Sequence, residues 1–300
     1  MSDWHKLGLI IEPNPTLWWS RTHTMVPTPH HLGKGIVRVY YSGRDDSNRS
    51  HIGWSLIDLN GEPRELDRSV DPVLAPGKLG CFDDNGVTPS CVIEREDGLY
   101  LYYLGWNPGS TVRMHLFGGL AISKDQGETF NRWSEAPILE RSPTDPYLNT
   151  APWVIWDRDQ WRIYYVSGTE WLHKDLPKYL IKTATSIDGK VWDRKGDICI
   201  DFASDNEVAL ARPYVIKSGG KYRMWFSHKG ENYRMGYAES KDGLNWTRTD
   251  ESCTLTVSDH GFDSEMIEYA AVVEYFGRQY VFYNGNNYGS GGIGLAVREL

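Results

Sequence analysis

An aromatic pair that closes a β-rich run returns five times along this chain of 300 residues. Successive pairs stand 62, 62, 61 and 57 residues apart, and each follows an alternating stretch rich in β-branched and aromatic residues. The pairs are Tyr40-Tyr41, Tyr102-Tyr103, Tyr164-Tyr165, Trp225-Phe226 and Phe282-Tyr283. Self-similarity at a fixed period indicates a repeat architecture, in which each unit buries its faces against its neighbours.

Each repeat has the pattern of four short antiparallel strands. An apolar strand precedes the aromatic one, and an Asp-Gly turn such as Asp242-Gly243 joins the third strand to the fourth. The first strands open at Thr28-Pro29, Thr88-Pro89, Ala151-Pro152, Arg212-Pro213 and Ala270-Ala271. One four-stranded sheet cannot bury both of its faces, whereas five packed radially can. The sequence therefore predicts an all-β fold, a five-bladed β-propeller.

The two ends of the chain are predicted to share the last blade. The fifth repeat stops after a third strand that ends near Val297, and residues 4–11 have the pattern of the missing fourth strand. The alternative is that residues 4–11 form a frayed tail. We expect a single domain over residues 1–300, with blades at about 24–75, 84–140, 147–200, 207–257 and 265–300 together with 4–11.

Composition and charge exclude several classes of partner. The net charge is -8 and no basic stripe is present, which argues against nucleic acid or anionic lipid. The chain has no apolar run long enough to cross a membrane and no signal-peptide core, so we expect a cytoplasmic protein. Its four cysteines lack metal-type spacing and are expected to be thiols. We expect no metal site and no cofactor, and the oligomeric state stays open.

In a propeller, the residues ahead of the inner strands and the loops that follow the second strands meet on one face. Acids, arginines, asparagines and aromatic rings gather at these positions, and that mixture suits a polyhydroxylated ligand such as a carbohydrate. The candidate substrate-binding residues are Arg212, Arg44, Asp45, His23, Asn149, Trp106, His228, Glu265 and Asn284.

A short element, Ser-x-Asp-Gly-x-x-Trp, recurs within the repeats, at Ser186–Trp192 and at Ser240–Trp246. With it, the chain resembles the five-bladed β-propeller glycosidase superfamily, which includes glycoside hydrolase families 32, 43, 68 and 130. The last repeat, from Ser264 to Gly289, is similar to uncharacterised members found in bacterial surface-polysaccharide contexts. The resemblance implies a glycosidic substrate, while fold alone does not establish the reaction.

The resemblance implies an Asp-Pro at the first inner strand, but this chain has Thr28-Pro29 and no carboxylate there. Glu207 corresponds to the fourth-blade acid, and we expect it to work with Asp84 or Glu268 as the base. The alternative for all three is a structural carboxylate held by N–H groups or cations. Arg212 is expected to bind a carboxylate or phosphate, or to pair with Glu207.

Three functions are compatible with this pattern. The first is a glycoside hydrolase that acts on a small or terminal sugar unit. The second is a glycosyltransferase or glycoside phosphorylase, favoured by the arginines at the mouth, Arg21, Arg44 and Arg212. The third is a non-catalytic carbohydrate-binding propeller. Carboxyl groups about 6.5–9.5 Å apart would indicate an inverting hydrolase, and about 5–5.5 Å a retaining one.

Overall fold

The computed structural model describes residues 3–300, so Met1 and Ser2 of the predicted domain lie outside the described residues. These residues form an all-β structure, as the sequence predicted, with one 3-10 turn, η1 (Asp250–Ser252), and one short helix, α1 (Asn286–Gly289). The strands are β1 (His5–Ile11), β2 (Thr22–Gly33), β3 (Ile36–Arg44), β4 (Ser50–Asp58), β5 (Arg64–Arg68), β6 (Gly86–Arg95), β7 (Gly98–Pro108), β8 (Met114–Ser123), β9 (Asn131–Arg132), β10 (Asn149–Asp157), β11 (Gln160–His173), β12 (Leu176–Ser186), β13 (Ile198–Ile200), β14 (Ala209–Ser218), β15 (Lys221–Lys229), β16 (Tyr233–Ser240), β17 (Trp246–Arg248), β18 (Glu268–Tyr275), β19 (Arg278–Asn284) and β20 (Ile293–Glu299).

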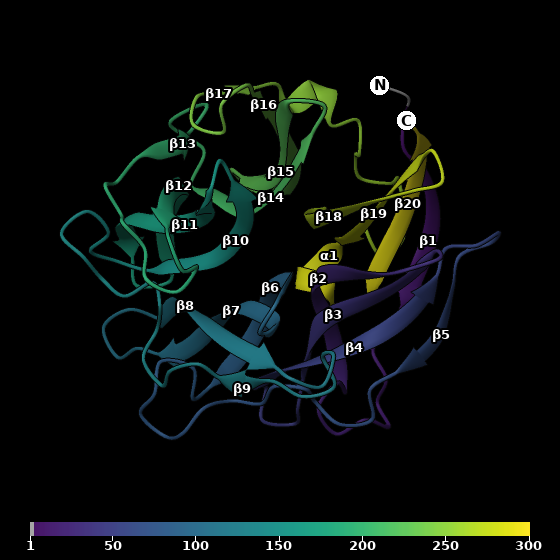
Figure 1. The fold of residues 1–300 in the computed structure, drawn as a ribbon, viewed down its shortest axis with the longest axis horizontal. Coiled ribbons are helices and arrows are strands. Elements are labelled where there is room, and N and C mark those ends of the chain that lie inside the picture. The colour runs from purple at the N-terminus through teal and green to yellow at the C-terminus, as the bar shows by residue number, and fades with distance from the viewer. Residues whose placement is uncertain (1–2) are drawn as a thin grey trace.

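Antiparallel pairing collects the strands into groups that follow the chain: β2–β5, β6–β9, β10–β13, β14–β17, and β18–β20 with β1. Several neighbouring groups are joined by single parallel bridges, such as Asn149 with Phe117 and Tyr179 with Ala209. The described strands form no closed sheet, because the groups meet mainly through side chains. Figure 1 shows the groups arranged about a common centre. There β2 contacts β6 and β18, and β10 contacts β6 and β14.

The N-terminal strand completes the C-terminal group. β1 pairs antiparallel with β20, so that His5 lies opposite Val297, as the sequence predicted. The indole N–H of Trp4 donates to the carbonyl of Cys253 at 2.9 Å. The Arg298 guanidinium lies over the same ring, 4.1 Å from its centroid. Residues near the two ends of the chain therefore hold one another in place.

The aromatic pairs are buried, and the two members of a pair point to opposite faces of their strand, where they make different contacts. All ten side chains of the pairs lie in the core. The first member reaches the neighbouring group: the Tyr102 hydroxyl donates to the carbonyl of Gly189 at 2.9 Å, and that of Tyr164 to Gly243 at 3.0 Å. Successive residues of a strand point to opposite faces, so the second member points the other way.

In three of the pairs, the second member is a tyrosine that binds a buried carboxylate twenty residues earlier in the chain. That carboxylate also binds a cation from the outer strand or the segment beside it. We call these acids the clamp carboxylates: Asp83 with Tyr103 and Arg132, Asp145 with Tyr165 and Arg194, and Asp263 with Tyr283 and Lys6. The contacts from these donors measure 2.6–3.3 Å. Each clamp fixes the start of a group to its second and outer strands.

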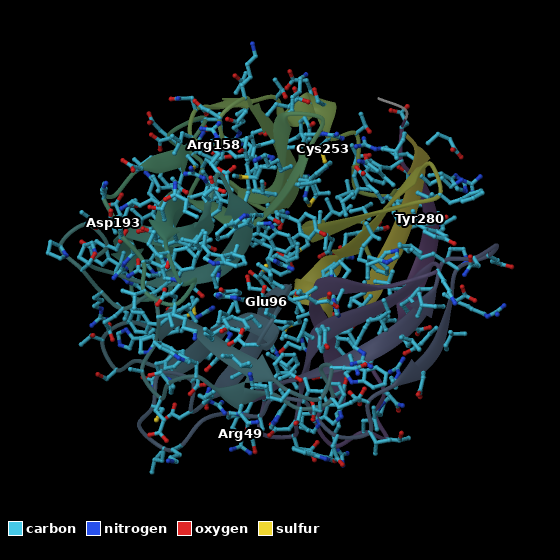
Figure 2. The ribbon with its side chains drawn as sticks, in the orientation of Figure 1. Arg49, Glu96, Arg158, Asp193, Cys253 and Tyr280 are labelled. Carbon is cyan, nitrogen blue, oxygen red and sulfur yellow. The ribbon has the colours of Figure 1, made fainter. Side chains whose placement is uncertain are left out.

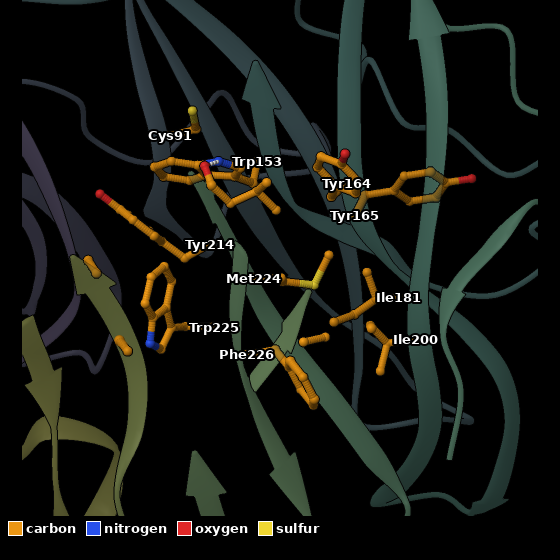
Figure 3. Close-up of a cluster of buried hydrophobic side chains, with 14 of the residues drawn as sticks. Cys91, Trp153, Tyr164, Tyr165, Ile181, Ile200, Tyr214, Met224, Trp225 and Phe226 are labelled. Atoms are coloured by element: carbon orange, nitrogen blue, oxygen red, sulfur yellow. Dashed lines mark hydrogen bonds between the residues drawn. The ribbon is translucent and has the colours of Figure 1, made fainter. Parts of the chain in front are cut away.

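Large side chains fill the space between neighbouring groups (Figure 2). Figure 3 shows part of this core, where Trp153 of β10 lies beside Tyr214 of β14 with ring centroids 4.0 Å apart. The Tyr214 hydroxyl continues to β18 and donates to the carbonyl of Val272 at 2.7 Å. Contacts of this kind hold the inner strands together without a hydrogen-bonded ladder between them.

Bulges in the inner strands correct the alignments made from the sequence in β2, β6 and β18. The bulge holds Ser90 after Pro89 in β6, and Tyr269 and Ala270 in β18. In β2, Met25 lies opposite Ser42 and Thr28 opposite Tyr40, which leaves Val26 and Pro27 in the bulge. The bulge in β14 likewise contains Arg212 and Pro213. The dipeptide equivalent to Arg212-Pro213 is therefore Val26-Pro27, not Thr28-Pro29. The first inner strand still offers no carboxylate at this position.

No helix among residues 3–300 is long and apolar enough to cross a membrane. The four cysteines are free thiols, as expected, and Cys81 is the partly exposed one.

Candidate functional site

A cavity of about 630 Å³ opens at the centre, where the inner strands begin and the second strands end. This is the face on which the sequence placed the candidate site. Its floor includes the bulge residues Val26, Ala151, Arg212 and Tyr269, and all four have left-handed φ angles, between 47° and 59°. Non-glycine residues rarely adopt this conformation, and such strain gathers at functional sites.

Four cations line the cavity: Arg44, Arg113, Arg212 and Lys229. Among the described residues, Asp175 is the one carboxylate on its walls, and its side chain is exposed at the rim. Cations that lie close together repel one another, and this repulsion raises the free energy of the charged site. An anion placed between them offsets the repulsion. A negatively charged group in the cavity would therefore be stabilised by these cations.

Arg212 is the most buried of these cations, with 2% of its surface exposed. Its guanidinium donates to the carbonyl of Pro27 at 2.8 Å, to the Thr28 hydroxyl at 3.0 Å and to the carbonyl of Ser90. Its Nε has no hydrogen-bond partner among the described residues. Burial lowers the pKa of Arg212 to about 10, which still leaves it charged at neutral pH. It does not pair with Glu207, which corrects one of the two roles expected for it.

Aromatic side chains form another part of the wall. Trp106 and four tyrosines, Tyr179, Tyr233, Tyr269 and Tyr288, line the cavity. The hydroxyls of Tyr179 and Tyr233 lie 2.5 Å apart. Flat rings offer apolar faces, and their hydroxyls offer hydrogen bonds at the edge. This combination fits a sugar ring, which has apolar C–H patches and polar hydroxyl groups.

Of the predicted substrate-binding residues, the structure brings Arg212, Arg44 and Trp106 together in the cavity. Arg44 is half-buried and donates to Asn48 at 3.1 Å. Burial lowers the pKa of Arg44, and the charge of Arg113 lowers it further.

The other predicted substrate-binding residues do not line this cavity. Asp45 binds Arg49 and His51, Asn149 donates to the carbonyl of Asp145 at 3.0 Å, and His228 contacts Glu207. Glu265 is exposed, and Asn284 accepts from the Val26 N–H at 2.8 Å, behind the floor. His23 lies near Arg44, and burial together with that charge lowers the pKa of His23 to about 4. Their predicted contacts with substrate stay predictions.

Glu207 holds a structural ion pair. Both of its oxygens accept from Arg248 of β17 at 2.7 Å, and His228 lies 2.9 Å away. Burial acts to raise the pKa of Glu207, but these hydrogen bonds and one from the Ala203 N–H outweigh it and lower the pKa to about 2. The position and the cation from the outer strand make Glu207 the counterpart of the clamp carboxylates in its group. Its role as the acid stays a prediction, and the cavity does not include it.

Asp84 also lies away from the cavity walls. It accepts from Asn107 at 2.9 Å and from the Gly80 N–H at 2.8 Å. Asp83, its neighbour, is the clamp carboxylate of this group. Asp84 therefore fixes the Gly80 loop to the end of β7, and its role as a base stays a prediction.

Glu268 differs from both. It begins β18 next to Tyr269, its exposed fraction is zero, and neither carboxyl oxygen has a hydrogen-bond partner among the described residues. Burial raises the pKa of Glu268 well above its usual range, and Tyr269 and Lys229 offset this only in part. Burial thus favours the protonated, neutral form of the Glu268 carboxyl group.

Several residues of the cavity were not among the candidates. Lys229 follows His228 at the end of β15, while Tyr179, Tyr233 and Arg113 stand at or before the beginnings of third strands. Tyr288 belongs to α1, which the repeat did not predict. Applying the repeat to the beginnings of the third strands would have found most of them. No cluster of metal-ligating side chains is present in the described part of the chain.

Comparisons with known proteins agree with this fold. No family model matches the chain. The uncharacterized protein Rv1502 of Mycobacterium tuberculosis is 40% identical over 297 residues, covering 99% of each chain. A 1,2-β-oligomannan phosphorylase of Thermoanaerobacter is 27% identical over 110 residues, covering 35% of this chain and 36% of its own.

Among solved structures, BT0996 in complex with RGII superposes with a TM-score of 0.78 at 21% identity, covering 99% of this chain and 92% of that one. A thermostable family-43 glycoside hydrolase superposes at 0.67 with 19% identity, covering 93% and 90%. At these identities the likeness concerns the fold, which is that of the β-propeller glycoside hydrolases. The chain belongs to the family of Rv1502 from Mycobacterium tuberculosis, and that family has this propeller fold.

Proposed function

We propose that the chain is a carbohydrate-active enzyme that breaks or forms a glycosidic bond with inorganic phosphate as one reactant. The proposal places the reaction in the cation-lined cavity, at the centre of a single domain whose five strand groups are propeller blades. Its sugar is a small or terminal unit, and bacterial surface-polysaccharide metabolism is its proposed setting, supported by the likeness of the last repeat.

The charge of the cavity is the observation that supports phosphate most directly. Arg44, Arg113, Arg212 and Lys229 line it, and among residues 3–300 the one carboxylate on its walls is that of Asp175 at the rim. Hydrolysis by the usual route needs two carboxyl groups on either side of the bond, one of which activates water. Phosphate carries its own negative charge and attacks without a base. The cavity therefore has the cations that phosphorolysis needs, and the described residues that line it do not include the two facing carboxylates that hydrolysis needs.

The rest of the cavity supports a sugar beside the phosphate. The tyrosines and Trp106 offer flat faces and hydroxyl groups, and the volume of about 630 Å³ is within the range of small-molecule sites. The similarity to a 1,2-β-oligomannan phosphorylase, although it covers only 110 residues, points to the same reaction class.

Hydrolysis is the second candidate, because the solved structures with this fold are glycoside hydrolases. In that case water replaces phosphate, and a carboxylate outside the present walls has to move in. A non-catalytic carbohydrate-binding protein is the third possibility, and it predicts binding without turnover.

The test is a panel of α- and β-linked disaccharides and oligosaccharides, each incubated with and without inorganic phosphate. We expect turnover that depends on phosphate and yields a sugar 1-phosphate, measured by chromatography with phosphorus NMR. Phosphate-independent release of the free sugar would replace the proposal with hydrolysis, and no turnover across the panel would leave binding alone.

A matched pair of lysine variants tests the phosphate site. Lys229 lines the cavity at one end of β15, and Lys221 lies exposed at the other end of the same strand. We expect Lys229→Met to raise the KM for phosphate about tenfold or more, the loss of one charge-assisted contact. Lys221→Met should leave it unchanged. Equal effects of the two variants would count against a phosphate site at Lys229.

A further inference from the structure

Glu268 places an unpaired carboxyl group directly behind the cavity wall. Its side chain is fully buried, and among the described residues neither oxygen accepts or donates a hydrogen bond. A buried polar group without a partner costs about 1–3 kcal/mol, and a buried charge costs far more. The unpaired Glu268 carboxyl group lowers the stability of the fold and lies beside a cavity. Such a group calls for a functional explanation.

Among the described residues, the groups around Glu268 do not clamp it with a cation as the other buried acids are clamped. Its titratable and charged neighbours are Tyr269 on its own strand, Tyr179 of β12, Tyr233 of β16 and Lys229 of β15. Three of the four are phenols, and burial raises the pKa of each of them. No arginine binds Glu268, in contrast to Glu207, which accepts two hydrogen bonds from Arg248.

Tyr269 connects this buried acid to the cavity. It lies next to Glu268, and its hydroxyl interacts with the carboxyl group at short range without the geometry of a full hydrogen bond. The Tyr269 side chain also lines the cavity. Its backbone is held in the left-handed region at φ 59°, and its N–H donates to the Ser227 hydroxyl at 2.8 Å. Tyr269 also acts electrostatically on Arg44 and Arg212, so it stands beside the cations of the cavity. A hydroxyl held between an acid and a cation-lined cavity is suited to passing a proton.

We propose that Tyr269 delivers, and Glu268 supplies, the proton that the leaving oxygen takes when the glycosidic bond breaks. This inference rests on the proposed function. A phosphate oxygen forms a bond to the anomeric carbon, and the bond from that carbon to the leaving oxygen breaks with its electron pair on the oxygen. That oxygen takes the proton of the Tyr269 hydroxyl, while Tyr269 takes the proton of Glu268. Glu268 is left as a carboxylate and regains a proton from solvent through the same hydroxyl after the products leave.

In this arrangement Tyr269 is the catalytic residue and Glu268 acts through it. The arrangement replaces Glu207 as the acid and gives Glu268 the opposite protonation state to the base first expected of it. A carboxylic acid that stays neutral at pH 7 can serve as a general acid, because its proton is present when the reaction begins.

The test compares leaving groups that need a proton with ones that do not. In Glu268→Gln and Tyr269→Phe, we expect turnover of a natural disaccharide to fall by about 10²-fold or more, the usual contribution of a general acid. A dinitrophenyl glycoside of the same sugar should keep nearly its wild-type kcat, because dinitrophenolate leaves without a proton. Glu274→Gln, on the same strand but exposed, is the control and should change neither rate.

A second measurement detects the proton itself. The infrared difference spectrum of wild type minus Glu268→Gln at pH 7 should show the carbonyl stretch of a protonated carboxyl group. The wild-type rate on the disaccharide should fall on the alkaline side as Glu268 ionises, and this limb should be missing in Glu268→Gln.

The outcomes separate this inference from the proposed function. If the wild type turns over its substrate but both glycosides slow equally in the variants, or neither slows, Glu268 and Tyr269 are not the proton donor and the proposed function stands. A carboxylate band at pH 7 in place of the protonated band also overturns the inference. If the wild type has no turnover at all, the proposed function fails and the inference fails with it.

Discussion

The buried carboxylates near the starts of the inner strands differ in their surroundings. The difference is whether a cation from another part of the chain binds the carboxyl group. Asp83, Asp145 and Asp263 are clamped by a tyrosine and a cation, and Glu207 is held by Arg248. In the described part of the chain, no cation hydrogen-bonds to Glu268. A bound cation favours the ionised form of a buried acid and lets it hold strands together, whereas burial without a cation favours the neutral form.

Glu207→Gln tests the structural role of the ion pair. The substitution leaves Arg248 with its Asp250 contact but without Glu207, and we expect a loss of about 2 kcal/mol in the free energy of unfolding at pH 7. The pKa of Glu207 is lowered from 4.5 to about 2, so its contribution is present above pH 4.5 and is lost as the pH falls toward 2. The difference between wild type and variant should therefore shrink over that range.

Urea midpoints at several pH values measure this difference. The exposed Glu231→Gln serves as the control and should track the wild type at every pH. A Glu207→Gln protein as stable as wild type at pH 7 but without turnover would instead restore Glu207 as a catalytic acid.

The site could be predicted from the sequence only as far as positions on the repeat. The face, and Arg212, Arg44 and Trp106 on it, follow from strand order. The environments of Glu207, Asp84 and Glu268 do not follow from strand order. Each depends on which side chains of other strands reach the carboxyl group. Arg248 lies 41 residues from Glu207, and nothing in its spacing alone marks it as the partner.

At the scale of the elements, the bulge in an inner strand determines which of its side chains lines the cavity. In β2, β10, β14 and β18 the first residue of the bulge takes a left-handed φ and lies on the floor of the cavity. These residues are Val26, Ala151, Arg212 and Tyr269. The sequence misplaced this position in β2 because the segment Val26–Pro29 contains two X-Pro dipeptides. Only the register against β3 shows that Val26-Pro27 occupies the bulge.

The hairpin between β18 and β19 offers a test of turn chemistry. Its two central residues, Phe276 and Gly277, both have positive φ, at 49° and 77°, while Tyr275 lies opposite Arg278. Asparagine accepts this conformation better than phenylalanine, and Phe276 is 92% exposed, so little burial is lost. We expect Phe276→Asn to stabilise the protein by about 1 kcal/mol, seen as a higher Tm in calorimetry.

Phe276→Val provides the opposite case, because a β-branched side chain tolerates positive φ least. It should lower the Tm. Equal Tm values for the two variants would mean that the turn is not strained.

At the scale of the whole molecule, the sequence predicted most of the architecture. The reason is that each of the five repeats indicates the same pattern of strands and turns independently. The aromatic pairs, the turns and the pairing of the two chain ends are all present in the structure. The ties through tyrosine hydroxyls were not predicted, since their acceptors are backbone carbonyls of another group, which no residue type marks.

Removing β1 tests how far the fold depends on the pairing of its ends. A chain that begins at Glu12 loses the β20 ladder and the Trp4 contacts, and it leaves β20 as an unpaired edge. We expect a loss of most of the roughly 5–15 kcal/mol by which such domains are stable, with association through the exposed edge. Thermal unfolding and size-exclusion chromatography measure the two effects.

A synthetic peptide of residues 3–12, added to the shortened protein, should restore the Tm, while a scrambled peptide should not. A shortened chain that stays monomeric at the wild-type Tm would show that β1 is dispensable.

The pairing of β1 with β20 also has a consequence for how the protein is made. The ribosome makes β1 before the other described strands, yet its partner strand β20 follows all of them. During synthesis, β1 has no native neighbour, while the four groups from β2 to β17 can assemble as they appear. The newborn chain therefore remains open until β20 has been made, and it completes this sheet only when β1 and β20 meet.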